Sequence, residues 1–335
     1  MSNIGIDFGT TNIVMTMGKK VVVNEPSIVA YDTRNKCVVA TGKEAYSMIG
    51  RTPDFIDIVR PMKDGVISNN VMAQSLLDGF INRLIRFQLL RPKIILCIPS
   101  FITEVESRAV VDLAVNTGSR NIHLIDETVS AVMGAGIDVS KSLGTLVIDI
   151  GGGTTDVAIV SLNGIVDAVS IRTASSSFDS SIIRYISTKH KLVVGELTAE
   201  RLKMEYANVY FPSKEENILV KGMNLYNNMP NTIRISEADI MLAIHDDILK
   251  IVNAIKLILE RANPNIVDDI CKHGAIMTGG GSMLNGLNKL LSKQIHVDCR
   301  VAENPLECVA KGTSIAFKNM NRLLDGFEHI KIKKM

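Results

Sequence analysis

One local pattern occurs twice in this sequence and restricts its fold more than any other feature. A short apolar run, an aspartate, a glycine turn with threonines and a second apolar run occupy residues 4–17, and the same order recurs at 146–160. The two aspartates, Asp7 and Asp149, are 142 residues apart. Each copy is typical of two strands joined by a tight turn, not of a strand leading into a helix. The repeat predicts two similar halves that face one cleft; two unrelated hairpins with the same turn chemistry are the alternative.

Turns of this kind suit phosphate groups. Glycine leaves the backbone N–H groups free to point at one anion, and threonine hydroxyls add further donors. An aspartate at the strand end can hold a hydrated Mg²⁺. A third glycine turn, residues 279–281, follows another short apolar run. We therefore expect phosphates between the first two turns and a nucleoside near the third, although a turn like the third, taken alone, is more often a tight strand-to-helix connection.

Composition and missing motifs exclude several other classes of protein. The chain has 335 residues, of which 46% are hydrophobic, enough for two domains or one bilobed domain. A net charge of +2, only 4% aromatic residues and no tryptophan give no indication of a nucleic-acid surface. The five cysteines form no CxxC pair and no signal peptide is recognised, so we expect a cytoplasmic protein. We find no P-loop, Rossmann fingerprint, zinc spacing or hydrolase elbow.

Several longer segments resemble one family. They run in order along nearly the whole chain and include DFGTTN at 7–12, GRTPDFIDIVRPMKDGVI at 50–67, DIGGGTTDVAIVSLNGIV at 149–166 and TGGGSMLNGL at 278–287. The sequence resembles the MreB family of bacterial actins, within the superfamily of actins, Hsp70 chaperones and sugar kinases. The segment at 50–67 resembles MreB in particular.

The resemblance implies an α/β, actin-like two-lobed fold. Two duplicated RNase H-like subdomains would each carry an inserted smaller subdomain. The implied boundaries are 1–32, 66–144 and 317–335 for subdomain IA, 33–65 for IB, 145–180 and 246–316 for IIA, and 181–245 for IIB.

The resemblance also implies ATP and Mg²⁺ as ligands. Asp7 and Asp149 would hold the metal through water. The residues implied to bind the nucleotide are Gly9, Thr10, Thr11, Asn12, Gly151, Gly152, Gly153, Thr154, Glu200, Lys203, Met204, Gly280, Gly281, Ser282 and Met283. On residue type alone, Glu200 and Lys203 would fit a solvated helix face.

The chain departs from the family pattern around the expected reaction centre. Residues 125–128 read Ile-Asp-Glu-Thr where the family has Ile-Glu-Glu-Pro, position 156 is Asp in place of Glu, and 175–177 are three serines. The resemblance makes Asp126, Glu127 and Asp156 the expected catalytic residues, with Asp126 and Asp156 orienting the attacking water. Because Asp is one methylene shorter than Glu, we expect slowed ATP hydrolysis; compensated drift with normal turnover is the alternative.

Partners are implied by the resemblance as well. We expect head-to-tail self-association into filaments, with paired protofilaments, and paralogous actins as further partners. An apolar loop with Phe87, Leu89 and Leu90 would contact an anionic membrane surface, or else pack on the neighbouring subdomain. The expected role is an actin-like ATPase for cell shape or motility at the inner face of the cell membrane, without nucleic acid. The alternative is a non-polymerising nucleotide switch like an Hsp70 or a sugar kinase, for which we identify no substrate domain and no second pocket.

Overall fold

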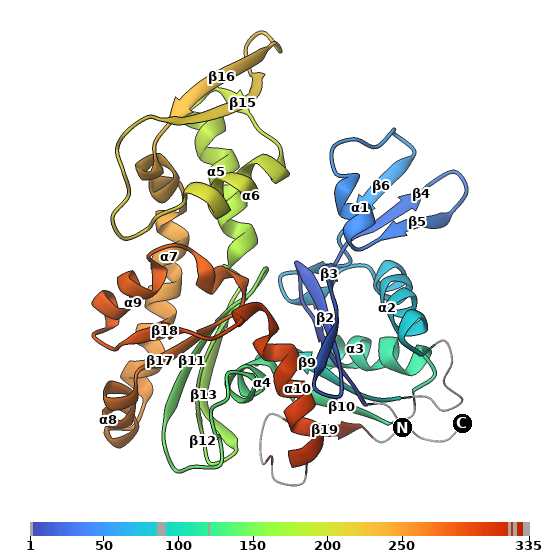
Figure 1. Ribbon diagram of the computed structural model, residues 1–335, viewed down its shortest axis with the longest axis vertical. Helices are drawn as coiled ribbons and strands as arrows, with labels where there is room; N and C mark the ends of the chain where they lie inside the picture. Colours follow the sequence, from blue (N-terminus) through green and yellow to red (C-terminus); the bar gives the residue numbers. More distant parts are fainter. Residues whose placement is uncertain (1–2, 86–91, 120, 321–322, 324–326, 331–335) are drawn as a thin grey trace.

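The computed structural model describes residues 3–85, 92–119, 121–320, 323 and 327–330 of the chain. Figure 1 shows two lobes, each with a large sheet and a smaller subdomain that extends beyond it on the same side of the molecule. No helix in these residues is both long enough and apolar enough to cross a membrane.

The first lobe is built on a six-stranded sheet in the order β19-β10-β9-β1-β2-β3. β1 pairs antiparallel with β2 and parallel with β9, which in turn pairs parallel with β10. Branched apolar residues such as Ile4 and Ile6 are fully buried and give these strands their pairing register. The strands are β1 (Asn3–Phe8), β2 (Asn12–Met17), β3 (Lys20–Pro26), β9 (Lys93–Ile98), β10 (Ile122–Asp126) and β19 (Phe327–Ile330).

The second lobe repeats this connectivity in a five-stranded sheet, β13-β12-β11-β17-β18. β11 pairs antiparallel with β12 and parallel with β17, as β1 does with β2 and β9. The duplication that the sequence predicts is therefore present in the sheet topology. The strands are β11 (Thr145–Ile150), β12 (Thr155–Ser161), β13 (Gly164–Ile171), β17 (Ala275–Thr278) and β18 (Cys299–Val301).

Helices cover both sheets, and the longest of those described is α7. α3 begins with a capping box, in which the Thr103 side chain and the Glu106 side chain each bond the backbone N–H of the other. α8 begins at Pro264, directly after α7. The helices are α2 (Asn70–Ile85), α3 (Glu104–Asn116), α4 (Glu127–Gly134), α5 (Ser175–His190), α7 (Glu237–Arg261), α8 (Pro264–His273), α9 (Leu287–Ile295) and α10 (Cys308–Asn319).

The lobes are joined at their base, where α4 of the first lobe packs against α10. A Cβ on Gly134 would lie 1.8 Å from the Cys308 carbonyl oxygen, and a Cβ on Gly312 would lie 1.8 Å from that of Ser130. Only glycine permits backbones to approach so closely. A hydrophobic cluster there contains buried residues of both sheets, including Ile95 and Val147. The base is therefore a shared core, and the cleft opens above it.

Each small subdomain has a three-stranded sheet of its own. In the first lobe it is β5-β4-β6 with α1, and in the second it is β14-β15-β16 with α6. Since β4 lies in the small sheet, the small subdomain of the first lobe begins at Val29, before the expected boundary at 33. In the second lobe, α5 and α7 run across the boundaries at 181 and 245 that were expected for subdomain IIB. The elements are β4 (Val29–Asp32), β5 (Cys37–Thr41), α1 (Lys43–Ser47), β6 (Ile56–Val59), β7 (Met62–Lys63), β8 (Val66–Ile67), β14 (Leu192–Val193), α6 (Glu196–Tyr206), β15 (Ile218–Asn224), β16 (Pro230–Ile235) and the 3-10 turns η1 (Gly280–Met283) and η2 (Pro305–Glu307).

Candidate nucleotide site

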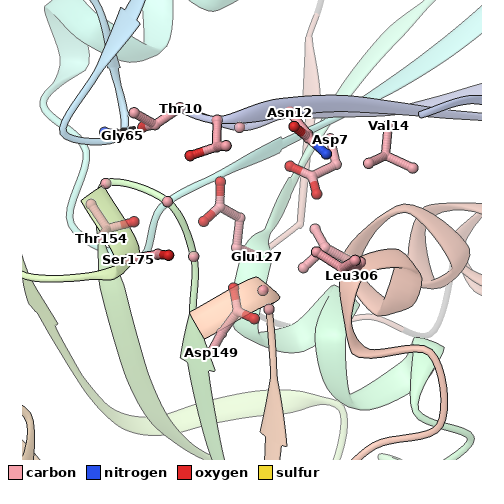
Figure 2. A pocket seen from close by; sticks show the side chains of 18 of the residues that line it. Asp7, Thr10, Asn12, Val14, Gly65, Glu127, Asp149, Thr154, Ser175 and Leu306 are labelled. Atoms are coloured by element: carbon pink, nitrogen blue, oxygen red, sulfur yellow. Dashed lines mark hydrogen bonds between the residues drawn. The ribbon is translucent and has the colours of Figure 1, made fainter. Parts of the chain in front are cut away.

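The two repeated glycine turns meet in the cleft between the lobes (Figure 2). One joins β1 to β2 and the other joins β11 to β12. A Cβ on Gly152 would lie 2.0 Å from the Thr11 Oγ1 atom, and a Cβ on Gly153 would lie 2.5 Å from that of Thr10. Side chains larger than hydrogen would thus separate the turns. The structure brings together these expected phosphate-binding residues, all of which line one cavity: Gly9, Thr10, Thr11, Asn12, Gly151, Gly152, Gly153 and Thr154.

Two carboxylates from equivalent strands line the same cavity, Asp7 from β1 and Asp149 from β11. Burial and then the neighbouring Asp149 raise the pKa of Asp7 to about 7. Burial likewise raises the pKa of Asp149 to about 6, although the Thr278 hydroxyl donates to its Oδ1 atom at 2.6 Å. A cation between the lobes would favour the ionised form of both groups.

The residues fit a hydrated Mg²⁺ ion. Such an ion takes one or two carboxylates, phosphate oxygens and several waters. Within the described residues, no three His, Cys, Asp or Glu side chains converge as a ready ligand set. Asp7 and Asp149, in a cavity also lined by glycine backbone and threonines, supply the oxygen chemistry that this ion prefers.

Of the two neighbouring acids where β10 meets α4, Glu127 lines the cavity between the glycine turns and Asp126 does not. Asp126 is 5% exposed and caps α4: its Oδ1 atom accepts hydrogen bonds from the Thr128 N–H at 2.8 Å and the Thr128 hydroxyl at 2.5 Å. Aspartate is a preferred N-cap residue. The expectation that Asp126 orients the water is thus corrected, and its shorter side chain gives no argument for slowed hydrolysis.

Glu127 has the surroundings of a catalytic acid–base group. Burial and then the Asp156 carboxylate raise the pKa of Glu127 well above its ordinary value, with smaller contributions from Asp7 and Asp149. Perturbed carboxyl groups of this kind cluster at reaction centres.

Asp156 lies next to this cavity, outside its lining. It is fully buried, and its polar neighbours are the hydroxyls of Ser170, opposite it in the β12–β13 ladder, and of Thr154. Asp156 sits directly opposite Asp149 in the β11–β12 ladder, so the two side chains share one face of the sheet. Burial raises the pKa of Asp156 to about 7. Asp156 therefore influences the site through its charge, without lining the cavity.

A second cavity lies on the other side of the third glycine turn. Glu200, Lys203 and Met204 of α6 line it, together with Gly280, Gly281 and Met283 of η1. Gly279 has φ +78°, and a Cβ there would lie 2.3 Å from the Ile150 carbonyl oxygen. Ser282, expected among these residues, is 1% exposed and donates its hydroxyl to the Gly279 carbonyl at 2.7 Å. It therefore supports the turn and does not line the cavity.

Some residues of the site were not assigned from the sequence. The Gly65 N–H donates to the Thr10 hydroxyl at 3.0 Å, which joins the segment after β7 to the first phosphate turn. Ser175 lines both cavities. The sequence signals were the MreB-like segment that contains Gly65 and the unusual serines at 175–177. The expected membrane residues Phe87, Leu89 and Leu90 lie outside the described residues.

The doubled hairpin sheet, with a small subdomain on each lobe and a glycine-lined cleft between them, defines an actin-like protein. The structure is similar to the crystal structure of MreB5 of Spiroplasma citri bound to ADP, with a TM-score of 0.89 and 32% identity over 95% of this chain and 97% of that one. The same protein bound to AMPPNP also gives a TM-score of 0.89. A MamK double helical filament gives 0.79 at 18% identity, which bears on the fold alone.

The chain belongs to the MreB/Mbl family of bacterial actins. The family model described as MreB/Mbl protein matches residues 1–325. The cell shape-determining protein Mbl of Bacillus subtilis is 41% identical over 323 residues, which cover 96% of this chain and 97% of Mbl. The cell shape-determining protein MreB of Escherichia coli is 38% identical over 318 residues, or 93% of this chain and 92% of that protein. The expected family and fold are confirmed, and a chaperone-like or kinase-like switch is not favoured.

Proposed function

We propose that this protein binds ATP with Mg²⁺ in the cleft, polymerises head to tail, and hydrolyses the ATP to ADP and phosphate. Its filaments would act in cell shape at the inner face of the cell membrane. The observation that carries the proposal is the meeting of two glycine turns beside Asp7, Asp149 and Glu127. The ADP and AMPPNP bound by MreB5 of Spiroplasma citri support the choice of nucleotide.

Each part of the site has one task in this proposal. The backbone N–H groups and threonines of the two turns bind the phosphates, and Asp7 and Asp149 hold the hydrated metal. When bound, Mg²⁺ neutralises charge on the phosphate oxygens. The cavity between α6 and η1 receives the nucleoside.

Glu127 is the residue that we assign to the attacking water. It orients the water toward the terminal phosphorus and takes its proton as the new P–O bond forms and ADP leaves. Asp156 acts through Glu127: its charge raises the pKa of Glu127 and so favours proton uptake. No covalent intermediate is needed.

Filament formation and membrane contact are further parts of the proposal. Head-to-tail contacts that do not close into a ring generate filaments, and two such protofilaments would pair side by side. Arg83 lies in the last turn of α2, close in sequence to the expected membrane residues Phe87, Leu89 and Leu90; 60% of its side chain is exposed, although it also pairs with Glu25 at 3.9 Å. A basic residue beside an apolar loop suits an anionic lipid surface. Paralogous actins would be further partners.

The test is sedimentation of the full chain with Mg-ATP, with Mg-ADP and without nucleotide, with released phosphate counted in the same tubes. We expect pelleting that depends on nucleotide, and flotation with anionic vesicles that is lost in Leu89→Ser/Leu90→Ser. Tight ATP binding without polymer, at any protein concentration and with lipid present, would refute the filament. Equal flotation of the serine variant would refute the membrane contact alone.

A further inference from the structure

Two side-chain contacts connect the small subdomains across the cleft. The Tyr46 hydroxyl, from α1, donates to the Oε2 atom of Glu200 on α6. Arg60, which follows β6, forms an ion pair with Glu196 at the start of the same helix. These partners are 154 and 136 residues apart in the chain. We call the two contacts the cross-lobe pair; α1 and α6, whose side chains take part in them, belong to different lobes in Figure 1.

The spacing along α6 explains why one helix can serve both lobes. Glu196 and Glu200 are four residues apart and share a helix face, and Lys203 follows three residues later on that face. Lys203 is 9% exposed and donates to the Ser175 hydroxyl and to Asp179, each at 2.8 Å. The C-terminal part of this face is therefore fixed to α5, whereas its N-terminal part is held by the other lobe.

The cross-lobe pair borders the nucleoside cavity. Tyr46 and Arg60 line a chamber with Glu196, Glu200 and Lys203, and Asn12 of the first phosphate turn belongs to the same lining. Glu200 and Lys203 also line the cavity assigned to the nucleoside. A nucleotide in the cleft would thus contact an acid whose position depends on the opposite lobe.

The chemistry of Tyr46 suits a fixed donor. Burial and then the Glu200 carboxylate raise the pKa of Tyr46, so the hydroxyl keeps its proton over the physiological range. The Tyr46 hydroxyl donates to Oε2 of Glu200, and Glu200 also lines the cavity assigned to the nucleoside. The hydrogen bond to an ionised acceptor is stronger than one between neutral groups.

We propose that Tyr46 and Arg60 complete the nucleoside site from the opposite lobe: they position Glu200 and keep the cleft closed, so that nucleotide release depends on them. The inference rests on the proposed function, because it assumes a nucleotide in the cleft. Tyr46 and Arg60 are positioning residues, and their loss acts on retention of the nucleotide more than on its capture.

The test measures how fast radiolabelled ADP leaves the full chain after addition of excess unlabelled ADP. Loss of one hydrogen bond to a charged group predicts roughly tenfold faster release in Tyr46→Phe. Glu196→Gln removes a more exposed ion pair, and we expect about threefold faster release. The matched control is Glu205→Gln, which breaks the ion pair of Glu205 with Arg201 on the same helix and leaves the other lobe untouched.

Exchanging the charges of Arg60 and Glu196 distinguishes a positioning role from a general loss of stability. Arg60→Glu alone should speed release, and Arg60→Glu with Glu196→Arg should restore it toward the wild-type rate, with the nucleotide-free melting temperature unchanged. Wild-type release rates in Tyr46→Phe and Arg60→Glu would overturn the inference, as would failure of the exchange to restore retention. If the wild-type chain binds no ADP or ATP at all, the proposed function fails instead.

Discussion

Alanine at position 126 and glutamine at position 127 should produce opposite effects on stability and catalysis. Asp126→Ala removes the side chain that caps α4, including bonds of 2.8 Å to the Thr128 N–H and 3.4 Å to the Val129 N–H. Replacing an N-cap residue by alanine costs about 0.5–2 kcal/mol. Because the capped N–H groups lie in a buried helix start, we expect about 2 kcal/mol for Asp126→Ala and a melting temperature lower by several degrees.

Glu127→Gln keeps the shape of the side chain but removes the proton acceptor. General base catalysis contributes about 10²–10⁴-fold to a rate, so phosphate release should fall about 100-fold. The folded protein should be at least as stable as the wild type, since a carboxyl group surrounded by Asp7, Asp149 and Asp156 becomes a neutral amide. Nucleotide-dependent pelleting should persist.

Both quantities are measured on the same preparations: phosphate release per polymerised subunit at saturating Mg-ATP, and thermal melting without nucleotide. The wild type and Asp126→Asn, which keeps a capping side chain, are the controls. If Asp126→Ala melts like the wild type but loses phosphate release, Asp126 is the carboxylate that activates the water and the assignment of Glu127 is wrong. Wild-type phosphate release in Glu127→Gln would refute it equally.

Two further predictions concern the buried charge and the glycine turns. Asp156→Asn should stabilise the nucleotide-free protein, and the gain should increase from pH 4 to pH 7. In the wild type the pKa of Asp156 is raised to about 7, so the free energy of unfolding falls as the pH rises through this window, by up to about 1.4 kcal/mol per pH unit. Parallel pH profiles of unfolding free energy for the two proteins would contradict this. Gly152→Ala should weaken nucleotide binding at least about tenfold in calorimetry, because its Cβ would lie 2.0 Å from Thr11 Oγ1; Gly79→Ala on α2, with open space around its Cβ, should bind like the wild type.

The residues that the sequence predicted best are those whose chemistry is local. A glycine turn between two apolar runs is a hairpin with its N–H groups exposed wherever it is placed, and the repeat of that hairpin requires two similar sheets. The third glycine turn was visible for the same reason. The family resemblance added the role of Glu200, Lys203 and Met204 on α6.

Asp126 shows where such arguments end. Two neighbouring acids at a strand–helix junction point in different directions, and only the path of the backbone decides which one enters the cleft. Here β10 ends so that Asp126 turns back to cap α4 while Glu127 lines the cavity between the two glycine turns. Ser282 is a similar case: its neighbours Gly281 and Met283 line the cavity, whereas Ser282 itself is buried in the interior.

The sequence by itself determined the duplicated sheets, the glycine cradle and the pair of aspartates at its base, because each follows from short-range steric and hydrogen-bonding rules. Only the tertiary structure decided which acid meets the phosphates and which groups close the cleft. Tyr46 and Glu200 are 154 residues apart and belong to different lobes. Their contact depends on how α4 and α10 set one lobe against the other, and that long-range geometry leaves no periodic signal in the chain.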